Sequence, residues 1–166
     1  MWRDKKIGVV IVAGGSGSRM GATVPKQFLR LGEEPILAHT VRKFRPYADH
    51  IVVVLPADQR ELWQELAEEC GLVGTHTVCE GGATRYDSVK NGLSALGEGC
   101  DLVAIHDGVR PLVSAAMIER GLECANSGGS AIPTVGAVDS FRVQTKEGLK
   151  VIDRSLLRAV QTPQIF

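Results

Sequence analysis

Short apolar runs alternate along the chain with longer segments in which apolar residues recur every three to four positions. The runs lie at residues 7–12, 51–55, 76–79, 102–106 and 130–133. Several of them are rich in β-branched residues and apolar on both sides, which is typical of parallel strands that are covered on both faces. The segments with helical spacing lie at residues 36–44, 58–70, 85–96 and 114–125. They are predicted to be the crossover helices that connect these strands.

The last part of the chain departs from this pattern. Residues 139–145 and 149–154 alternate between apolar and polar side chains around the short segment 146–148, which ends in glycine. This arrangement predicts a β-hairpin. The hairpin is either a projecting arm used for dimerisation or an edge hairpin folded back on its own sheet. The predicted fold is therefore α/β, with three Rossmann-like layers, a mostly parallel central sheet and a hairpin arm at residues 139–154.

Composition narrows the class of protein. The 166 residues are the size of one domain, and 19 basic residues balance 19 acidic ones. A net charge of zero argues against a nucleic acid partner, and no apolar run approaches the roughly 20 residues that span a membrane. The cysteines are Cys70, Cys79, Cys100 and Cys124. They form no Cys-x-x-Cys pair, so a reduced cytoplasmic protein fits better than a zinc or disulfide framework.

Glycine is the outlier of the composition. The 19 glycines are about 11% of the chain, against roughly 7% in average proteins, and they predict tight loops. The densest cluster, residues 13–21, reads Ala-Gly-Gly-Ser-Gly-Ser-Arg-Met-Gly and directly follows the first predicted strand. A dinucleotide-binding fingerprint would need glycine where Met20 stands, and a P-loop would need Gly-Lys-Ser or Gly-Lys-Thr, whereas Lys26 lies between proline and glutamine.

What remains is a glycine-lined turn with two cations, Arg19 and Lys26. Backbone N–H groups in such a turn can converge on phosphate oxygens because no Cβ atoms block the approach. Arg19 offers a planar fork for a phosphate, and Lys26 offers a compact charge near a reacting phosphorus atom. This pattern favours a nucleoside triphosphate as the ligand. The alternative is that the glycines only make the turn tight and that both cations are simply solvated.

The glycine loop and several later blocks together resemble the signature of the sugar-phosphate nucleotidyltransferase superfamily. The later blocks are residues 81–89 (Gly-Gly-Ala-Thr-Arg-Tyr-Asp-Ser-Val), 106–111 (His-Asp-Gly-Val-Arg-Pro), 139–140, 153–154 and 161–164 (Gln-Thr-Pro-Gln). In this order they are most similar to the 2-C-methyl-D-erythritol 4-phosphate cytidylyltransferase family of the non-mevalonate isoprenoid pathway. The resemblance covers nearly the whole chain and implies a nucleotidyltransferase fold. Because family members continue past the last block, we expect the chain to be a C-terminally incomplete version of this single domain.

The resemblance implies transfer of CMP from CTP to 2-C-methyl-D-erythritol 4-phosphate, with release of pyrophosphate. A phosphate oxygen of the substrate would attack the α-phosphorus of CTP, and no general base is needed because a phosphate monoester, with a second pKa of about 6, is already anionic. Fixed cations and Mg²⁺ would stabilise the charge on the crowded α-phosphate.

The resemblance also assigns roles to individual residues. The expected catalytic cations are Arg19 and Lys26. The expected nucleotide-binding residues are Ala13, Gly14, Gly15, Gly17, Gly82, Arg85 and Ser88. The expected residues for the polyol phosphate are Arg110, Asp139, Ser140 and Arg154. Arg154 lies at the end of the hairpin, and its counterpart in the family reaches the active site of the other subunit, so a homodimer is implied; alternatively, Arg154 is a plain surface cation.

Asp107 ends a predicted central strand, which places its carboxylate at the carboxyl edge of the sheet beside the glycine loop. A carboxylate there suits Mg²⁺, and the family uses its matching aspartate in this way. The alternatives are that Asp107 caps the following turn or pairs with Arg110. His106 is expected to be a packed, hydrogen-bonded residue without a catalytic role.

Three other functions are considered. Ribitol 5-phosphate cytidylyltransferase shares the scaffold and several of the blocks, so the alcohol pocket must separate it from the leading hypothesis. A catalytically silent nucleotide-binding domain would have no chemical need for Arg19, Lys26 and Asp107 together. A hexose 1-phosphate nucleotidyltransferase is disfavoured by the block at residues 106–111.

Overall fold

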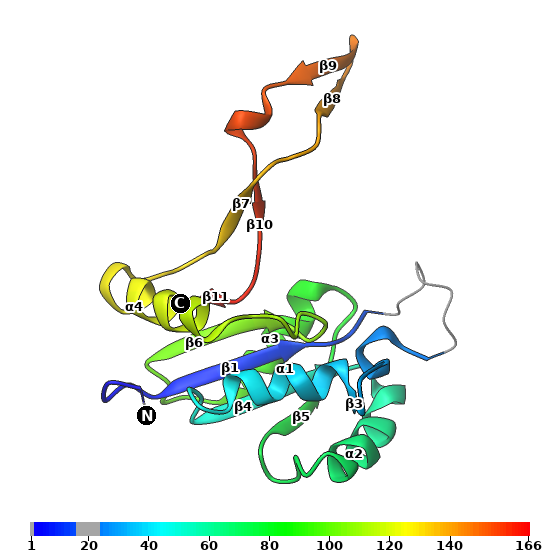
Figure 1. Ribbon diagram of the computed structural model, residues 1–166, viewed down its shortest axis with the longest axis vertical. Helices are drawn as coiled ribbons and strands as arrows, with labels where there is room; N and C mark the ends of the chain where they lie inside the picture. Colours follow the sequence, from blue (N-terminus) through cyan, green and yellow to red (C-terminus); the bar gives the residue numbers. More distant parts are fainter. Residues whose placement is uncertain (1, 16–23) are drawn as a thin grey trace.

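A five-stranded central sheet organises the computed structural model, which describes residues 2–15 and 24–166 (Figure 1). Its strands are β1 (Ile7–Val12), β4 (His50–Leu55), β5 (Thr77–Glu80), β6 (Leu102–Asp107) and β11 (Gln164–Ile165). Their order is β11-β6-β1-β4-β5. The pairs β1–β4, β1–β6 and β4–β5 are parallel, and β11 runs antiparallel to β6. The mostly parallel sheet predicted from the apolar runs is confirmed.

Four α-helices connect these strands within the described residues. They are α1 (Ile36–Phe44), α2 (Arg60–Glu69), α3 (Arg85–Leu96) and α4 (Ala115–Gly128). The predicted bounds 36–44 and 85–96 are confirmed, whereas the start of the segment 58–70 belongs to a short 3-10 turn, η3 (Ala57–Gln59). Helix α3 begins at a capping box formed by Thr84 and Asp87, which satisfies two backbone N–H groups at its first turn.

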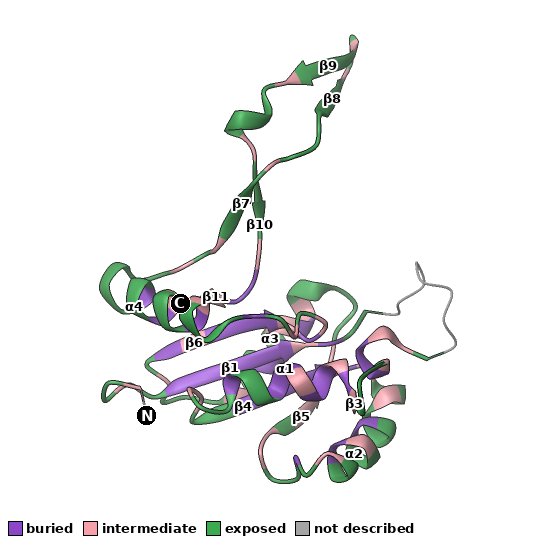
Figure 2. Ribbon diagram, viewed as in Figure 1, coloured by how far each residue is buried: buried purple, intermediate pink, exposed green. Residues whose placement is uncertain are grey.

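The sheet separates two apolar layers of unequal size. On β1, Ile7, Val9 and Ile11 belong to the larger core, which also contains residues of α1, α2 and α4. Val10 belongs to a smaller core on the other face, which α3 covers. Figure 2 shows the buried residues concentrated in the sheet and on the helix sides that face it. The predicted three-layer architecture is therefore confirmed.

The smaller layer is thin because α3 approaches the sheet closely. A Cβ atom added at Gly92 of α3 would lie 2.4 Å from Cγ1 of Val10 and 2.8 Å from Cγ2 of Val54. Real Cβ atoms do not make such contacts, so only glycine fits at this position.

The prediction of a strand at residues 130–133 is wrong. Ala131 makes a single bridge to Ile165, exchanging backbone hydrogen bonds of 2.7 and 2.9 Å with it. Pro133 has no N–H to donate to a ladder, and the chain leaves the sheet there. The next strand is β7 (Thr134–Gly136), which pairs with β10 (Arg158–Val160) outside the central sheet.

The predicted hairpin at residues 139–154 is confirmed and projects from the body as an arm (Figure 1). Strands β7 and β10 form its base, and β8 (Phe141–Thr145) and β9 (Gly148–Ile152) form its tip. Strands β8 and β9 form a two-stranded sheet separate from the central one, so the alternative of a hairpin folded back on its own sheet is wrong. Apolar side chains are exposed along the arm; they include Phe141, Val143, Leu149, Val151 and Leu156.

The remaining short elements flank the body. They are η2 (Lys26–Phe28), β2 (Arg30–Leu31), β3 (Glu34–Pro35) and, at the arm, η4 (Arg154–Leu156). No helix among residues 2–15 and 24–166 is both long and apolar enough to pass through a membrane.

Candidate active site

A cleft of about 620 Å³ opens at the carboxyl ends of β1, β5 and β6, where open α/β sheets bind their ligands. Nine of the residues that line it were predicted from the sequence as site residues, namely Ala13, Gly14, Gly15, Lys26, Gly82, Arg85, Ser88, Asp107 and Arg110. The other lining residues among those that the structure describes are Val12, Gln27, Ala83, Thr84 and Val109. The predicted site residues Gly17 and Arg19 lie outside the described residues.

The end of the Lys26 side chain lies against Gly15, which follows β1. A Cβ atom at Gly15 would lie 3.1 Å from Cε and 3.2 Å from Nζ of Lys26, so the absence of a side chain at Gly15 leaves room for the lysine. The turn η2 that carries Lys26 is anchored by Phe28, whose buried ring stacks on Trp63 at a centroid distance of 6.2 Å. The ammonium group therefore lies beside Gly15.

The opposite wall of the cleft is the loop between β5 and α3. Ser88 is buried, and its hydroxyl accepts a hydrogen bond from the N–H of Gly82 at 3.0 Å and donates one to the carbonyl of Thr84 at 2.9 Å. The N–H of Gly81 donates to the carbonyl of Leu55 on β4 at 2.8 Å. These hydrogen bonds fix the shape of the loop, so Ser88 organises this wall; its direct contact with a nucleotide stays a prediction.

Asp107 lies between two arginines at the mouth of the cleft. Its Oδ1 accepts a hydrogen bond from Nη2 of Arg85 at 3.1 Å, and its Oδ2 accepts one from Nε of Arg110 at 2.9 Å. Burial raises the pKa of the Asp107 carboxyl, but the hydrogen bonds from Arg110 and Arg85 outweigh this effect and leave the pKa below its ordinary value. Asp107 is therefore ionised at neutral pH. Its pairing with Arg110 was one of the alternatives that the sequence left open.

The backbone after Asp107 is also fixed. The N–H of Gly108 donates to the carbonyl of Val12 at 2.8 Å, and the carbonyl of Gly108 accepts from the hydroxyl of Thr40 at 2.8 Å. His106 is fully buried, its ring contacts Phe44, and its Nε2–H donates to the carbonyl of Arg110 at 3.1 Å. Burial lowers the pKa of His106. The prediction that this histidine is a packed, hydrogen-bonded residue is confirmed.

Comparison with known proteins identifies the family. A model of the family described as IspD, 2-C-methyl-D-erythritol 4-phosphate cytidylyltransferase, matches residues 7–166. The chain is 45% identical over 163 residues to the cytidylyltransferase of this name from Bacteroides thetaiotaomicron, covering 97% of this chain and 74% of the relative. The one from Porphyromonas gingivalis is 46% identical over 163 residues, with 98% and 73% covered. The chain belongs to the 2-C-methyl-D-erythritol 4-phosphate cytidylyltransferase family.

Solved structures agree with this assignment. The crystal structure of 4-diphosphocytidyl-2C-methyl-D-erythritol synthase from Anaerococcus prevotii superposes with a TM-score of 0.80 at 26% identity, covering 98% of this chain and 70% of that one. The Thermus thermophilus 2-C-methyl-D-erythritol 4-phosphate cytidylyltransferase has a TM-score of 0.71 at 32% identity, with 97% and 70% covered. The resemblance stated from the sequence blocks, the nucleotidyltransferase class of enzyme and the Rossmann-like fold are therefore confirmed.

Three residues predicted for this cytidylyltransferase site lie on the arm and not in the cleft. Asp139, Ser140 and Arg154 are exposed and do not line the cleft of their own chain. The guanidinium of Arg154 donates to the carbonyl of Val138 at 2.8 Å, across the middle of the arm. Their roles in substrate binding stay predictions.

Gln161 and Thr162, to which the sequence assigned no role, form hydrogen bonds with two residues that line the cytidylyltransferase cleft. Gln161 accepts a hydrogen bond from Arg110 through its side chain, and the hydroxyl of Thr162 accepts the N–H of Asp107. Both belong to the Gln-Thr-Pro-Gln block that contributed to the resemblance. The block itself was the signal, but nothing in a linear sequence shows that it lies against residues 107–110.

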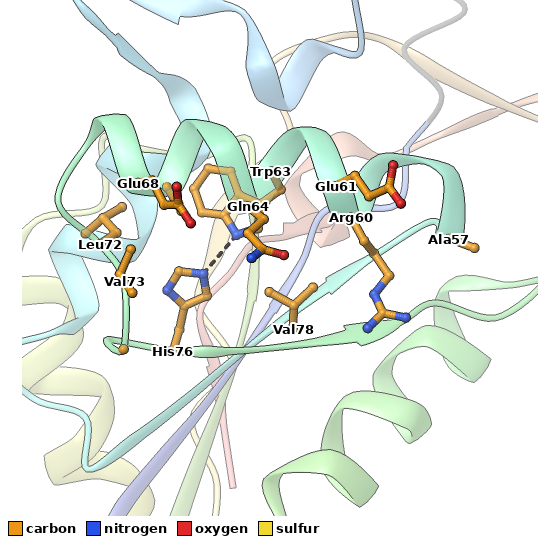
Figure 3. Close-up of a pocket in the computed structure, with 12 residues that line it drawn as sticks. Ala57, Arg60, Glu61, Trp63, Gln64, Glu68, Leu72, Val73, His76 and Val78 are labelled. Carbon is orange, nitrogen blue, oxygen red and sulfur yellow. Dashed lines mark hydrogen bonds between the residues drawn. The ribbon is translucent and has the colours of Figure 1, made fainter.

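A second hollow, of about 420 Å³, lies between α2 and β5 and contains none of the predicted site residues (Figure 3). Its inner wall is the fully buried Trp63, whose indole N–H donates to Nε2 of His76 at 2.8 Å. Gln64, Val78 and Arg60 line the hollow to one side of this pair in Figure 3. A buried indole N–H needs a hydrogen-bond partner because it is removed from water, and His76 provides that partner for Trp63.

Proposed function

We propose that this protein transfers the cytidylyl group of CTP to 2-C-methyl-D-erythritol 4-phosphate and releases pyrophosphate, as a step in the synthesis of isoprenoid precursors. The observation that carries the proposal is the cleft itself. It brings Gly14, Gly15 and Lys26 into one cleft with the ionised Asp107 and its partners Arg85 and Arg110, at the edge of the sheet where ligands bind. Membership of the family supplies the reaction, because relatives up to 46–47% identical carry this name.

The proposed chemistry follows from the charges of the reactants. A monoester phosphate is already anionic at neutral pH, so it can attack the α-phosphorus of CTP without a general base. The barrier lies in bringing two anions together and in stabilising the charge that builds up on the α-phosphate. Lys26, whose side chain lies against Gly15, and Arg19 are proposed to stabilise this charge. Arg110, at the mouth of the cleft, is proposed to bind the phosphate of the polyol.

The base of CTP is proposed to bind against the loop at residues 81–88 with Ala13 and Gly14 on its other side. The hydrogen bonds between Ser88, Gly82 and Thr84 make this loop a preformed surface. Arg85 stands at the start of α3 and already contacts Asp107, so it connects the base-binding wall to the charged centre of the cleft.

Mg²⁺ is the proposed divalent cation, and Asp107 is its proposed protein ligand. No group of three or more His, Cys, Asp or Glu residues within the described ranges could hold a metal ion alone. A single half-buried carboxylate fits Mg²⁺ held chiefly by nucleotide phosphates and water, which is how this ion usually binds. When bound there, Mg²⁺ would neutralise charge on the triphosphate. Each carboxylate oxygen accepts one hydrogen bond from an arginine and keeps a second lone pair, so Mg²⁺ could bind there without displacing Arg85 or Arg110.

A homodimer through the arm is also part of the proposal. The tip exposes Phe141, Val143, Leu149 and Val151 on a hairpin whose two strands form a sheet separate from the central one. A second copy would cover this apolar surface and would bring Asp139, Ser140 and Arg154 toward the partner's cleft. Sedimentation equilibrium of the chain tests the dimer directly. A cytoplasmic location remains a prediction from the spacing of the cysteines.

Pyrophosphate release tests the reaction and its substrate. We expect turnover with CTP, Mg²⁺ and 2-C-methyl-D-erythritol 4-phosphate, a much lower rate with UTP or ATP, and loss of activity with EDTA. The control replaces the acceptor by ribitol 5-phosphate at equal concentration. Equal or faster turnover with ribitol 5-phosphate would refute the proposed substrate, and no turnover with either acceptor would refute the proposed activity.

A further inference from the structure

Gln161 lies at the point where the arm joins the body. It directly follows β10, and its backbone N–H donates to the carbonyl of Pro133 at 2.8 Å, just before β7 begins. The two strands of the arm's base are therefore tied together at this residue. Its side chain extends the other way, where Oε1 accepts a hydrogen bond from Nη1 of Arg110 at 2.8 Å.

This contact completes the fixation of the Arg110 side chain. Its Nε donates to Oδ2 of Asp107 at 2.9 Å, while Nη1 donates to Gln161. A guanidinium is planar and rigid, so two hydrogen bonds at different nitrogens define its orientation as well as its position. Within the described part of the chain, Nη2 of Arg110 has no hydrogen-bond partner, which leaves that nitrogen for a ligand in the cleft.

The backbone groups of Arg110 and Asp107 also contact other parts of the chain. The carbonyl of Arg110 accepts from His106, and the N–H of Asp107 lies 3.4 Å from the hydroxyl oxygen of Thr162, the residue after Gln161. Thr162 is buried. The segment at the foot of the arm therefore contacts both the carboxylate-bearing residue and the arginine at the mouth of the cleft.

We propose that Gln161 is a positioning residue for the transfer reaction: it holds the guanidinium of Arg110 against Asp107 and so connects the base of the arm to the cleft. The proposal rests on the proposed function and deepens it. Without Gln161, Arg110 keeps one hydrogen bond and can rotate about it, since the side chain is about half exposed. Binding of the acceptor phosphate must then also restrict the rotation of the Arg110 guanidinium. This cost lowers the affinity and turnover for the acceptor but not the affinity for CTP.

The test is a double-mutant cycle. Gln161→Met keeps the length and bulk of the side chain and removes its hydrogen-bond acceptor. We expect kcat/KM for 2-C-methyl-D-erythritol 4-phosphate to fall about tenfold, as for the loss of a hydrogen bond to a charged group, while KM for CTP stays within about twofold. In an Arg110→Ala background the same substitution should change kcat/KM by less than about twofold, because Gln161 acts through Arg110.

The matched control is Gln144→Met on β8, where the residue is exposed and its side-chain amide donates to the carbonyl of the neighbouring Thr145. It should leave all rate constants unchanged. An equal loss from Gln161→Met with and without Arg110 would overturn the proposal, and so would unchanged kinetics in the single variant. Unfolding midpoints of the variants establish that each one is folded.

A measurement on the protein without substrates separates this inference from the proposed function. The Nε–H resonance of Arg110, assigned by its loss in Arg110→Lys, should be visible and slow to exchange in the wild-type protein. Gln161→Met should broaden it or speed its exchange, and Gln144→Met should not. A wild-type protein that turns over no acceptor refutes the proposed function, whereas an Arg110 resonance that is absent, or that is unaffected by Gln161→Met, refutes the positioning role.

Discussion

Gly15→Ala tests whether the position of Lys26 matters for catalysis without changing any charged group. The added Cβ would lie 3.1 Å from Cε and 3.2 Å from Nζ of Lys26, whereas ordinary contacts of this kind fall between 3.4 and 4 Å. The atoms that the added Cβ approaches are at the far end of the flexible Lys26 side chain, so the lysine can move aside. We therefore expect the substitution to displace the ammonium group and to leave the fold intact.

The magnitude follows from the displacement. Restoring ordinary contact requires a shift of about 0.5 Å, and because a misplacement of about 1 Å can cost about 10²-fold in rate, we expect kcat to fall about tenfold. Stability should move in the other direction. The backbone of Gly15 is outside the left-handed region, and replacing such a glycine by alanine restricts the unfolded chain, which stabilises a protein by about 0.4–1 kcal/mol.

The assay is steady-state pyrophosphate release at saturating CTP and acceptor, together with thermal unfolding of the same samples. The control is Gly128→Ala at the end of α4, where an added Cβ meets nothing within 4 Å. A lower kcat with an unchanged or higher Tm supports the reasoning. If Gly15→Ala turns over at the wild-type rate, the position of Lys26 against Gly15 is not the one that the reaction uses.

Three further predictions concern the cleft and the core. Lys26→Ala should lower kcat by about 10²–10³-fold but weaken CTP binding less than tenfold; equal losses in stopped-flow turnover and calorimetric binding would assign Lys26 to ground-state binding. Gly92→Ala should lower the free energy of unfolding in urea by about 1–3 kcal/mol, because its Cβ would overlap Val10, and an unchanged midpoint would contradict the close packing of α3. Burial lowers the pKa of His76. Below about pH 6.5 the unfolded chain therefore binds a proton at His76 more readily than the folded protein does, so the free energy of unfolding falls as the pH falls, by at most about 1.4 kcal/mol per pH unit. His76→Gln should flatten this part of the urea stability profile, whereas a slope that persists unchanged would show that other groups cause it.

The sequence predicted most of the central fold because its signals are local. Apolar runs and helical spacing are properties of neighbouring residues, so the bounds of α1, α3 and β1 could be read directly. The segment at residues 130–133 was misjudged because its apolar residues look like a strand. What decides its structure is the missing N–H of Pro133 and the distant partner Ile165, with which Ala131 makes only one bridge.

In the candidate site, too, the positions of some residues could be predicted from local sequence, whereas contacts between distant segments could not. Residues that follow strands, such as Gly15 and Asp107, could be placed at one edge of the sheet because parallel strands end there together. The contact between Asp107 and Arg85 could not be predicted, since Arg85 lies 22 positions earlier, at the start of α3. Gln161 was beyond sequence reasoning because its contact with Arg110 spans 51 positions and depends on where the arm rejoins the body.

The central claim, transfer of a cytidylyl group onto a polyol phosphate, is tested most directly by ³¹P NMR of the reaction products. With CTP, Mg²⁺ and 2-C-methyl-D-erythritol 4-phosphate, we predict that the monoester signal disappears as pyrophosphate and the two coupled resonances of an asymmetric cytidine diphosphate diester appear in equal amounts. A spectrum in which CTP and the monoester persist unchanged, or in which CTP is hydrolysed without formation of the diester, would contradict the account.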